Sequence, residues 1–265
     1  MIKVLFKKEW KANYKIFIIF LLVLTLYSSI IVAMFDPKLG ESLNAMKDAM
    51  PQIFAAFNMT DPGVTLLDFL TNYLYGFILI VFPFIYTVIM CHRLMSRYID
   101  KGSMAYLLST RHTRTRVMLS QLAVLLSGLL GLIIYVIILI LVCSHLMFNE
   151  TLDMSAFLLT NLGLFSIHLL FACICYFGAC CFNETKYSIG LGTSVGIFSI
   201  LVQMLSQVSD KLEFLKYFTP LTLFDPKGLQ AQDSQAILGM VILWISSMLI
   251  VLITQRIFKK RDLPL

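Results

Sequence analysis

The chain has 265 residues, of which 59% are hydrophobic and only 14% are charged, and its formal net charge is +6. A mean hydropathy of +0.85 is too high for an ordinary soluble domain and is typical of a membrane protein. The basic residues lie in short segments between apolar stretches, which is the pattern of membrane orientation, so we do not expect a nucleic-acid partner.

Six apolar stretches each have at least the roughly 20 residues that a helix needs to cross the hydrocarbon core. No charged side chain lies near the middle of a stretch, where it would cost about 3 kcal/mol. The stretches are Ile16–Phe35, Tyr73–Cys91, Val117–Phe148, Ser155–Cys181, Ser188–Val208 and Ala236–Ile257. They predict an all-α integral membrane protein with six transmembrane helices in a single domain, residues 1–265.

Lys and Arg are distributed unevenly among the connecting segments. With the N-terminus placed in the cytosol, the inner segments hold sixteen of the 21 basic residues: 1–15, 92–116, 182–187 and 256–265. Because basic residues accumulate on the cytosolic side, we expect both termini to be cytosolic.

Residues 1–15 carry an apolar stripe at helical spacing beside a stripe of lysines. This pattern predicts an interfacial helix on the inner leaflet, with Phe6 and Trp10 in the membrane surface and the lysines facing anionic lipid. The alternative is a plain cytosolic extension of the first span. The first stretch has no small-residue cleavage site and is longer than the apolar core of a signal peptide, so we expect a retained helix.

Two outer segments also contain apolar residues at helical spacing. In the first, the pattern from Leu43 to Phe57 predicts a short outer-leaflet helix before the second span, and Asn58–Gly63 then breaks it. In the second, Asp210–Gln235, apolar residues precede Thr219 and Pro220 and predict a similar helix before the sixth span.

Several kinds of chemistry lack their sequence pattern. The chain has no G-x-x-x-x-G-K-[ST] loop and no H-E-x-x-H, and no acid lies in the middle of a span. These absences argue against ATP hydrolysis by this chain, a zincin site and an ion-coupled carrier. The six cysteines lie in or at the ends of spans, so we expect small buried hydrophobes with no metal and no disulfide framework. We expect no cofactor.

Residues Gly192–Gly196 match G-x-S-x-G, the pattern around a hydrolase serine, and His168 lies in the preceding span. One interpretation is an intramembrane serine hydrolase that uses Ser194 and His168. However, the hydrolase motif requires a strand–turn–helix, whereas this segment is a membrane helix. Small residues four apart, Gly192 with Gly196 and Gly190 with Ser194, favour close helix packing instead.

Two other polar features lie inside spans. Pro83 is expected to kink the second span, with water or neighbouring groups satisfying the freed carbonyl. We expect His168 to form an interhelical hydrogen bond or to face a wet cavity.

The inner segment between the second and third spans is long enough for a helix of its own. A break and an N-cap hydroxyl are followed there by a compact apolar face, which predicts a docking surface. The residues concerned are Lys101, Gly102, Ser103, Met104, Tyr106, Leu107 and Leu108. The alternative is a loop helix that lies on lipid headgroups, as the flanking basic residues would also allow.

Four features together resemble the ABC-2 type permease subunits of bacterial ATP-binding-cassette exporters. They are the basic amphipathic N-terminus, the Leu43–Phe57 helix, the Asp100–Thr110 stretch (DKGSMAYLLST) and the Phe218–Pro226 stretch (FTPLTLFDP). The resemblance covers essentially the whole chain. One departure is Arg111, where the family usually has proline.

The resemblance implies a permease subunit in a bacterial cell membrane that has no ATPase site of its own. Residues 102–108 would be a coupling helix that inserts into a separate ATPase subunit, which binds the ATP. A second permease copy, identical or paralogous, would complete a cavity that expels an amphipathic or hydrophobic substrate such as a peptide, an antibiotic or a lipid-like molecule. The other interpretations are a non-transporting sensor or interaction subunit and the serine hydrolase.

Overall fold

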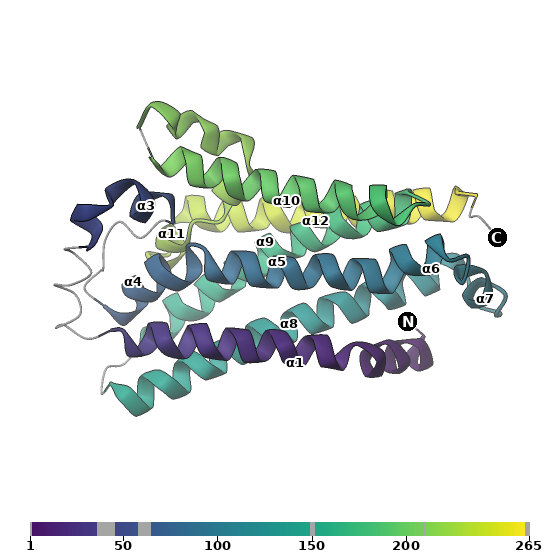
Figure 1. Cartoon of the computed structure of the whole chain (residues 1–265), viewed down its shortest axis with the longest axis horizontal. Helices are drawn as coiled ribbons and strands as arrows, with labels where there is room; N and C mark the ends of the chain where they lie inside the picture. The colour runs from purple at the N-terminus through teal and green to yellow at the C-terminus, as the bar shows by residue number, and fades with distance from the viewer. Residues whose placement is uncertain (1, 36–45, 58–64, 149–151, 209, 263–265) are drawn as a thin grey trace.

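The computed structural model describes residues 2–35, 46–57, 65–148, 152–208 and 210–262. Six helices in this part are long and apolar enough to cross a membrane, which confirms a helical multi-pass membrane protein. They are α1 (Lys3–Ala33), the continuous helical segment Ile78–Asp100 that begins with α5 (Ile78–Cys91), α8 (Arg114–Met147), α9 (Met154–Cys181), α10 (Thr185–Val208) and α12 (Ser234–Lys260). The helices run side by side, and both chain ends lie at the end of the bundle that carries α7 (Met104–Leu108) (Figure 1).

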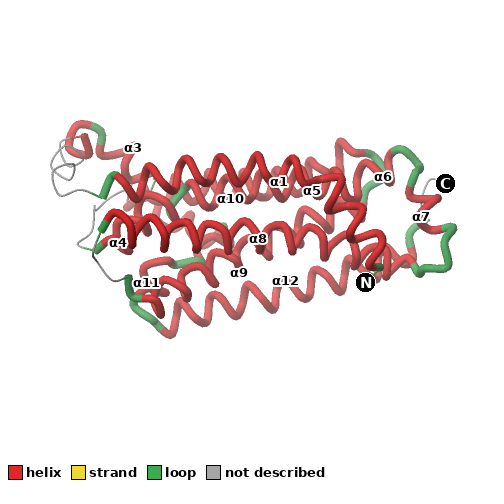
Figure 2. The backbone as a smooth tube through the Cα atoms, turned by 90° about the horizontal axis from the view of Figure 1, so that it is seen from below, coloured by secondary structure: helices red, strands yellow, loops and turns green. Residues whose placement is uncertain are grey.

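Helix α9 is the most buried of the six spans and packs against α5, α8, α10 and α12. Figure 2 shows α9 between α8 and α12. Small residues allow α9 and α10 to approach closely: a Cβ added at Gly192 would lie 2.6 Å from the Cα of Cys175. Gly196 likewise packs on the ring of Phe84 in α5. The predicted packing role of Gly192 and Gly196 is therefore confirmed, whereas Gly190 has nothing within 4 Å of its added Cβ.

The second span begins later and ends later than its apolar stretch predicts. Residues Thr71–Tyr75 form a separate π-helical turn, η1, and the chain leaves helical geometry at Phe77 (φ −138°, ψ −54°) before α5 begins. After Cys91 the helix continues through η2 (His92–Ser96) and α6 (Arg97–Asp100) as one candidate span, Ile78–Asp100. α5, η2 and α6 form a continuous rod that leads directly to α7 (Figure 1).

The expected interfacial helix at the N-terminus is not a separate element, because residues 3–33 form one uninterrupted helix. The segment contains no glycine or proline that would break it. Its apolar stripe packs on α8: the backbone N–H of Ile2 donates to Ser120 Oγ at 2.7 Å, and Trp10 Nε1 donates to Ser127 Oγ at 3.0 Å. Phe6 is half-buried against the core. The segment is thus continuous with the first span, and the placement of Phe6 and Trp10 in the membrane surface stays a prediction.

Short helices precede the second and sixth spans, and their expected place in the outer leaflet stays a prediction. The first set is α3 (Pro51–Ala56) and α4 (Leu66–Leu70), and the second is η3 (Asp210–Phe218), η4 (Pro220–Leu223) and α11 (Pro226–Gln230). Leu43 and the Asn58–Gly63 break lie outside the described residues. Helix α4 is buried, starts in a capping box of Thr65 and Asp68, and is tied to α11 by a bond from Gln230 Nε2 to Asp68 Oδ1 at 2.6 Å.

Candidate functional site

Helix α7 extends beyond the bundle at the end where both chain termini lie (Figure 1). Gly102 precedes it with a φ of +66°, so the predicted break is present at a position that favours glycine. Met104 is buried in the core, and Leu107 and Leu108 are half-buried against it. Tyr106 is 81% exposed. Part of the predicted apolar docking face is thus turned toward the bundle, and the large exposed side chain of α7 is Tyr106.

The predicted N-cap at Ser103 is wrong. Ser103 has a helical backbone (φ −71°, ψ −9°) and makes no capping bond, whereas a capping residue usually has an extended backbone. Its hydroxyl instead donates back to the Tyr98 carbonyl oxygen at 3.3 Å. Lys101, at the end of α6, is exposed.

Hydroxyl groups end α7 at the point where the resemblance would place a proline. Ser109 Oγ donates to the Tyr106 carbonyl at 2.9 Å, and Thr110 Oγ1 donates to the Leu107 carbonyl at 2.8 Å. These bonds satisfy two of the carbonyl groups that a helix end leaves open. Arg111 therefore follows a helix end that the Ser109 and Thr110 side chains already stabilise.

A cluster of polar side chains that the sequence patterns did not reveal joins η2 and α6, the elements just before α7, to α1. We call Glu9, Asn13, Arg93 and Tyr98 the α1–α6 cluster. The Tyr98 hydroxyl donates to Glu9 Oε1 at 2.7 Å, and Arg93 Nε donates to Asn13 Oδ1 at 2.6 Å. Glu9 and Asn13 are buried and four residues apart, on the side of the N-terminal helix opposite the lysine stripe, which is the one sequence signal that could have identified them. These bonds join η2 and α6, at the end of the second span, to α1.

An apolar groove of about 470 Å³ lies between α5 and α10. Its walls run from Phe77 to Ile89 on α5 and from Thr193 to Met204 on α10. At one end Phe57 packs edge-on against Phe77, with ring centroids 4.8 Å apart. Among the described residues Thr193 is the one polar residue of the lining, so the groove suits an apolar group better than a charged one.

The structure does not bring Ser194 and His168 into a catalytic pair. Ser194 is exposed, and its hydroxyl donates to the Leu191 carbonyl within its own helix at 3.1 Å. His168 is fully buried, and its Nε2 lies 2.7 Å from the Leu79 carbonyl oxygen. The predicted interhelical hydrogen bond of His168 is confirmed.

The Leu79 carbonyl can accept this bond because Pro83 leaves it without a donor in its own helix. Residue 83 would donate to the Leu79 carbonyl in a regular helix, but Pro83 has no N–H. His168 supplies the missing donor, and this agrees with the expectation that a neighbouring group would satisfy the carbonyl freed by Pro83. A carbonyl only accepts, so Nε2 carries a proton in this bond, and Nδ1 has no hydrogen-bond partner among the residues that the structure describes.

Within the described ranges, no three His, Cys, Asp or Glu side chains gather as a metal site requires. All six cysteines are free, and four of them are buried, so they pack as hydrophobes. Comparisons with protein-family models, with curated proteins and with solved structures gave no match.

Proposed function

We propose that this chain is the transmembrane subunit of an ATP-binding-cassette exporter of the ABC-2 type, in a bacterial cell membrane. The observation that carries the proposal is α7, a short helix with an exposed tyrosine beyond the end of a six-span bundle. Its sequence context, DKGSMAYLLST, is the stretch that resembles the coupling helix of that family. An exposed aromatic side chain on a rigid helix suits docking to a partner protein.

The mechanism follows from the continuity of α7 with α5. A separate ATPase subunit binds ATP, closes and pushes on α7. The rod of α5, η2 and α6 transmits this push to Phe77–Ile89, which line the apolar groove. The α1–α6 cluster carries the same displacement to α1. A second permease copy faces the groove and completes the cavity.

The cargo is amphipathic or hydrophobic: a peptide, an antibiotic or a lipid-like molecule moved outward. The groove lining supports this class because the part of it that the structure describes is uncharged. The chain itself needs no cofactor, because the partner ATPase binds the ATP.

Two alternatives make different predictions. A sensor or interaction subunit would have the same spans but bind no ATPase. A serine hydrolase would need Ser194 beside a base, and the separate partners of Ser194 and His168 give that interpretation no support.

The test is purification of the tagged chain from its native host in mild detergent, with mass spectrometry of the proteins that accompany it. The informative variant is Tyr106→Asp, because Leu107 and Leu108 also pack against the core and their substitution would disturb the fold. Tyr217→Asp is the matched control: Tyr217 is 76% exposed and belongs to η3, at the opposite end of the bundle. Loss of a buried tyrosine contact typically weakens binding at least roughly tenfold.

An ATPase that accompanies the wild type and Tyr217→Asp, but is at least tenfold depleted with Tyr106→Asp, would support the permease and its coupling helix. An ATPase retained by Tyr106→Asp would place the contact elsewhere on the chain. If no ATPase accompanies any of the three proteins, the exporter proposal is wrong and the sensor interpretation takes its place.

A further inference from the structure

A second, polar pocket lies at the end of the bundle opposite α7. Its volume is about 260 Å³, and it is enclosed by the end of α10, the turn at Tyr75 and Gly76, and the segment from Lys216 to Lys227. Its apolar floor includes Leu221 and Phe224, both buried. The last turn of α10 ends at Val208 beside it, so the pocket lies where a span leaves the hydrocarbon core.

The rim of the pocket carries two lysines. Lys216 Nζ donates to Glu213 Oε1 at 2.6 Å, which occupies one of its three protons. Glu213 is exposed and Lys216 is half-buried, and the pairing lowers the pKa of the Glu213 carboxyl and raises the pKa of the Lys216 ammonium. Lys227 supplies the second cation. Two cations on one rim suit an anionic group such as a phosphate.

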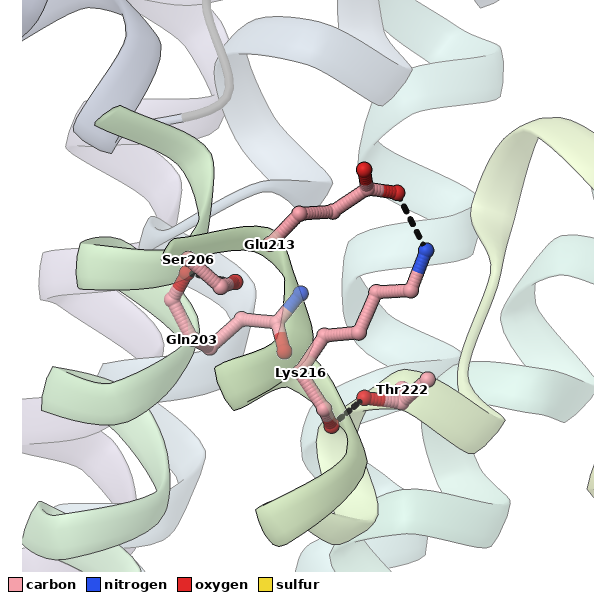
Figure 3. A network of polar contacts seen from close by, with 5 residues as sticks. All are labelled: Gln203, Ser206, Glu213, Lys216 and Thr222. Atoms are coloured by element: carbon pink, nitrogen blue, oxygen red, sulfur yellow. Dashed lines mark hydrogen bonds and ion pairs between the residues drawn. The ribbon is translucent and has the colours of Figure 1, made fainter. Parts of the chain in front are cut away.

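The same rim also offers groups that accept hydrogen bonds. Gln203 Oε1 is buried and has no hydrogen-bond partner among the described residues. The carboxylate of Asp225 is exposed, with one oxygen accepting from the Lys227 backbone N–H at 3.1 Å. Figure 3 shows Gln203 on α10 and Lys216 on the following segment. A ligand that brought only an anion would leave Gln203 unsatisfied and meet the Asp225 charge.

We propose that this pocket binds the headgroup of a zwitterionic phospholipid whose ammonium group carries N–H donors, as in phosphatidylethanolamine. The phosphate contacts Lys216 and Lys227, and the ammonium donates to Gln203 Oε1 and Asp225. The glycerol and the first acyl carbons cover Leu221 and Phe224. The pocket lies at headgroup depth whichever way the chain is oriented, so the inference does not depend on the proposed transport function.

The experiment is native mass spectrometry of the purified full-length chain with three lipids of identical acyl chains, mixed in equal amounts. Phosphatidylethanolamine has the phosphate and the N–H donors, phosphatidylcholine has a cation without N–H donors, and phosphatidylglycerol has no cation. Because charge-assisted hydrogen bonds are each worth about a tenfold change in affinity, we expect roughly tenfold preference for phosphatidylethanolamine over each of the others. Soluble phosphoethanolamine should displace it, and inorganic phosphate at the same concentration should not.

The variant is Lys216→Gln with Lys227→Gln, expected to reduce retention of phosphatidylethanolamine at least roughly tenfold. The matched control is Lys211→Gln with Lys260→Gln, which makes the same change in charge at two exposed lysines outside the pocket. Equal retention of the three lipids, displacement by inorganic phosphate alone, or equal loss in the control variant would each overturn the proposal. If the double variant does not fold, the lipid comparison and the competition with the wild type still decide it.

Discussion

The hydrogen bond between His168 and the carbonyl that Pro83 frees gives a sharp quantitative prediction. In His168→Leu the Leu79 carbonyl loses the donor that lies 2.7 Å away, inside a buried helix interface. An unsatisfied buried carbonyl costs about 1–3 kcal/mol, and hydrogen bonds between membrane helices are worth about 1–2 kcal/mol. We therefore expect His168→Leu to lower the free energy of unfolding by about 1–2 kcal/mol from this bond, with any loss of packing added.

A double-mutant cycle separates the hydrogen bond from packing. Pro83→Ala restores an N–H at residue 83, which can donate to Leu79 within α5 as in a regular helix. In that background the carbonyl keeps a donor when His168 is removed. The cost of His168→Leu should then fall by at least about 1 kcal/mol, which is the coupling energy of the pair.

The assay is reversible unfolding of the four proteins by sodium dodecyl sulfate in mixed micelles, followed by the loss of helical circular dichroism. The informative quantity is the difference between the two costs of His168→Leu, because effects on the unfolded state cancel in the cycle. Equal costs in the wild-type and the Pro83→Ala backgrounds would refute the reasoning and reduce His168 to a space-filling side chain.

Two further predictions concern glycines. Gly192→Ala should lower the free energy of unfolding by about 1–3 kcal/mol, because its Cβ would lie 2.6 Å from the backbone of Cys175. Gly190→Ala is the control: its Cβ meets open space, so the substitution should be neutral or slightly stabilising. Equal effects of the two substitutions in the same unfolding assay would contradict the close packing of α9 and α10. Gly102→Ala should strain the left-handed turn before α7 by about 1–2 kcal/mol and weaken retention of the proposed ATPase partner. Gly102→Asn should weaken that retention less, because asparagine tolerates φ near +66°. Identical retention by both variants would show that the turn does not position α7.

The sequence was sufficient for the spans because the cost of a charge in the bilayer is large and local. That cost leaves apolar stretches whose length alone identifies α8, α9 and α10. The break at Gly102 could also be predicted from local sequence, since glycine favours the left-handed backbone conformation (φ near +66°) that other residues avoid.

Features that depend on contacts between distant residues could not be predicted in this way. The bond between His168 and Leu79 joins residues 89 apart, and only the packed bundle determines which carbonyl the ring meets. The N-terminal apolar stripe was ambiguous for a related reason: an apolar face fits a membrane surface and a neighbouring helix equally well, and in the structure it packs on α8. The apolar face of α7 was ambiguous in the same sense, because Met104 faces the core while Tyr106 does not.

The proline in α5 also bears on how the proposed coupling would work. A push on α7 reaches the groove only if the rod of α5, η2 and α6 moves as one body, and a proline that leaves a carbonyl unsatisfied is a common place for a helix to bend. His168 satisfies that carbonyl from α9, the most buried span, and so holds the rod against the centre of the bundle at this point. His168→Leu should therefore impair coupling more than its loss of stability alone would, and Pro83→Ala should restore both. Transport that survives in His168→Leu, in protein that stays folded, would mean that the push does not travel along α5.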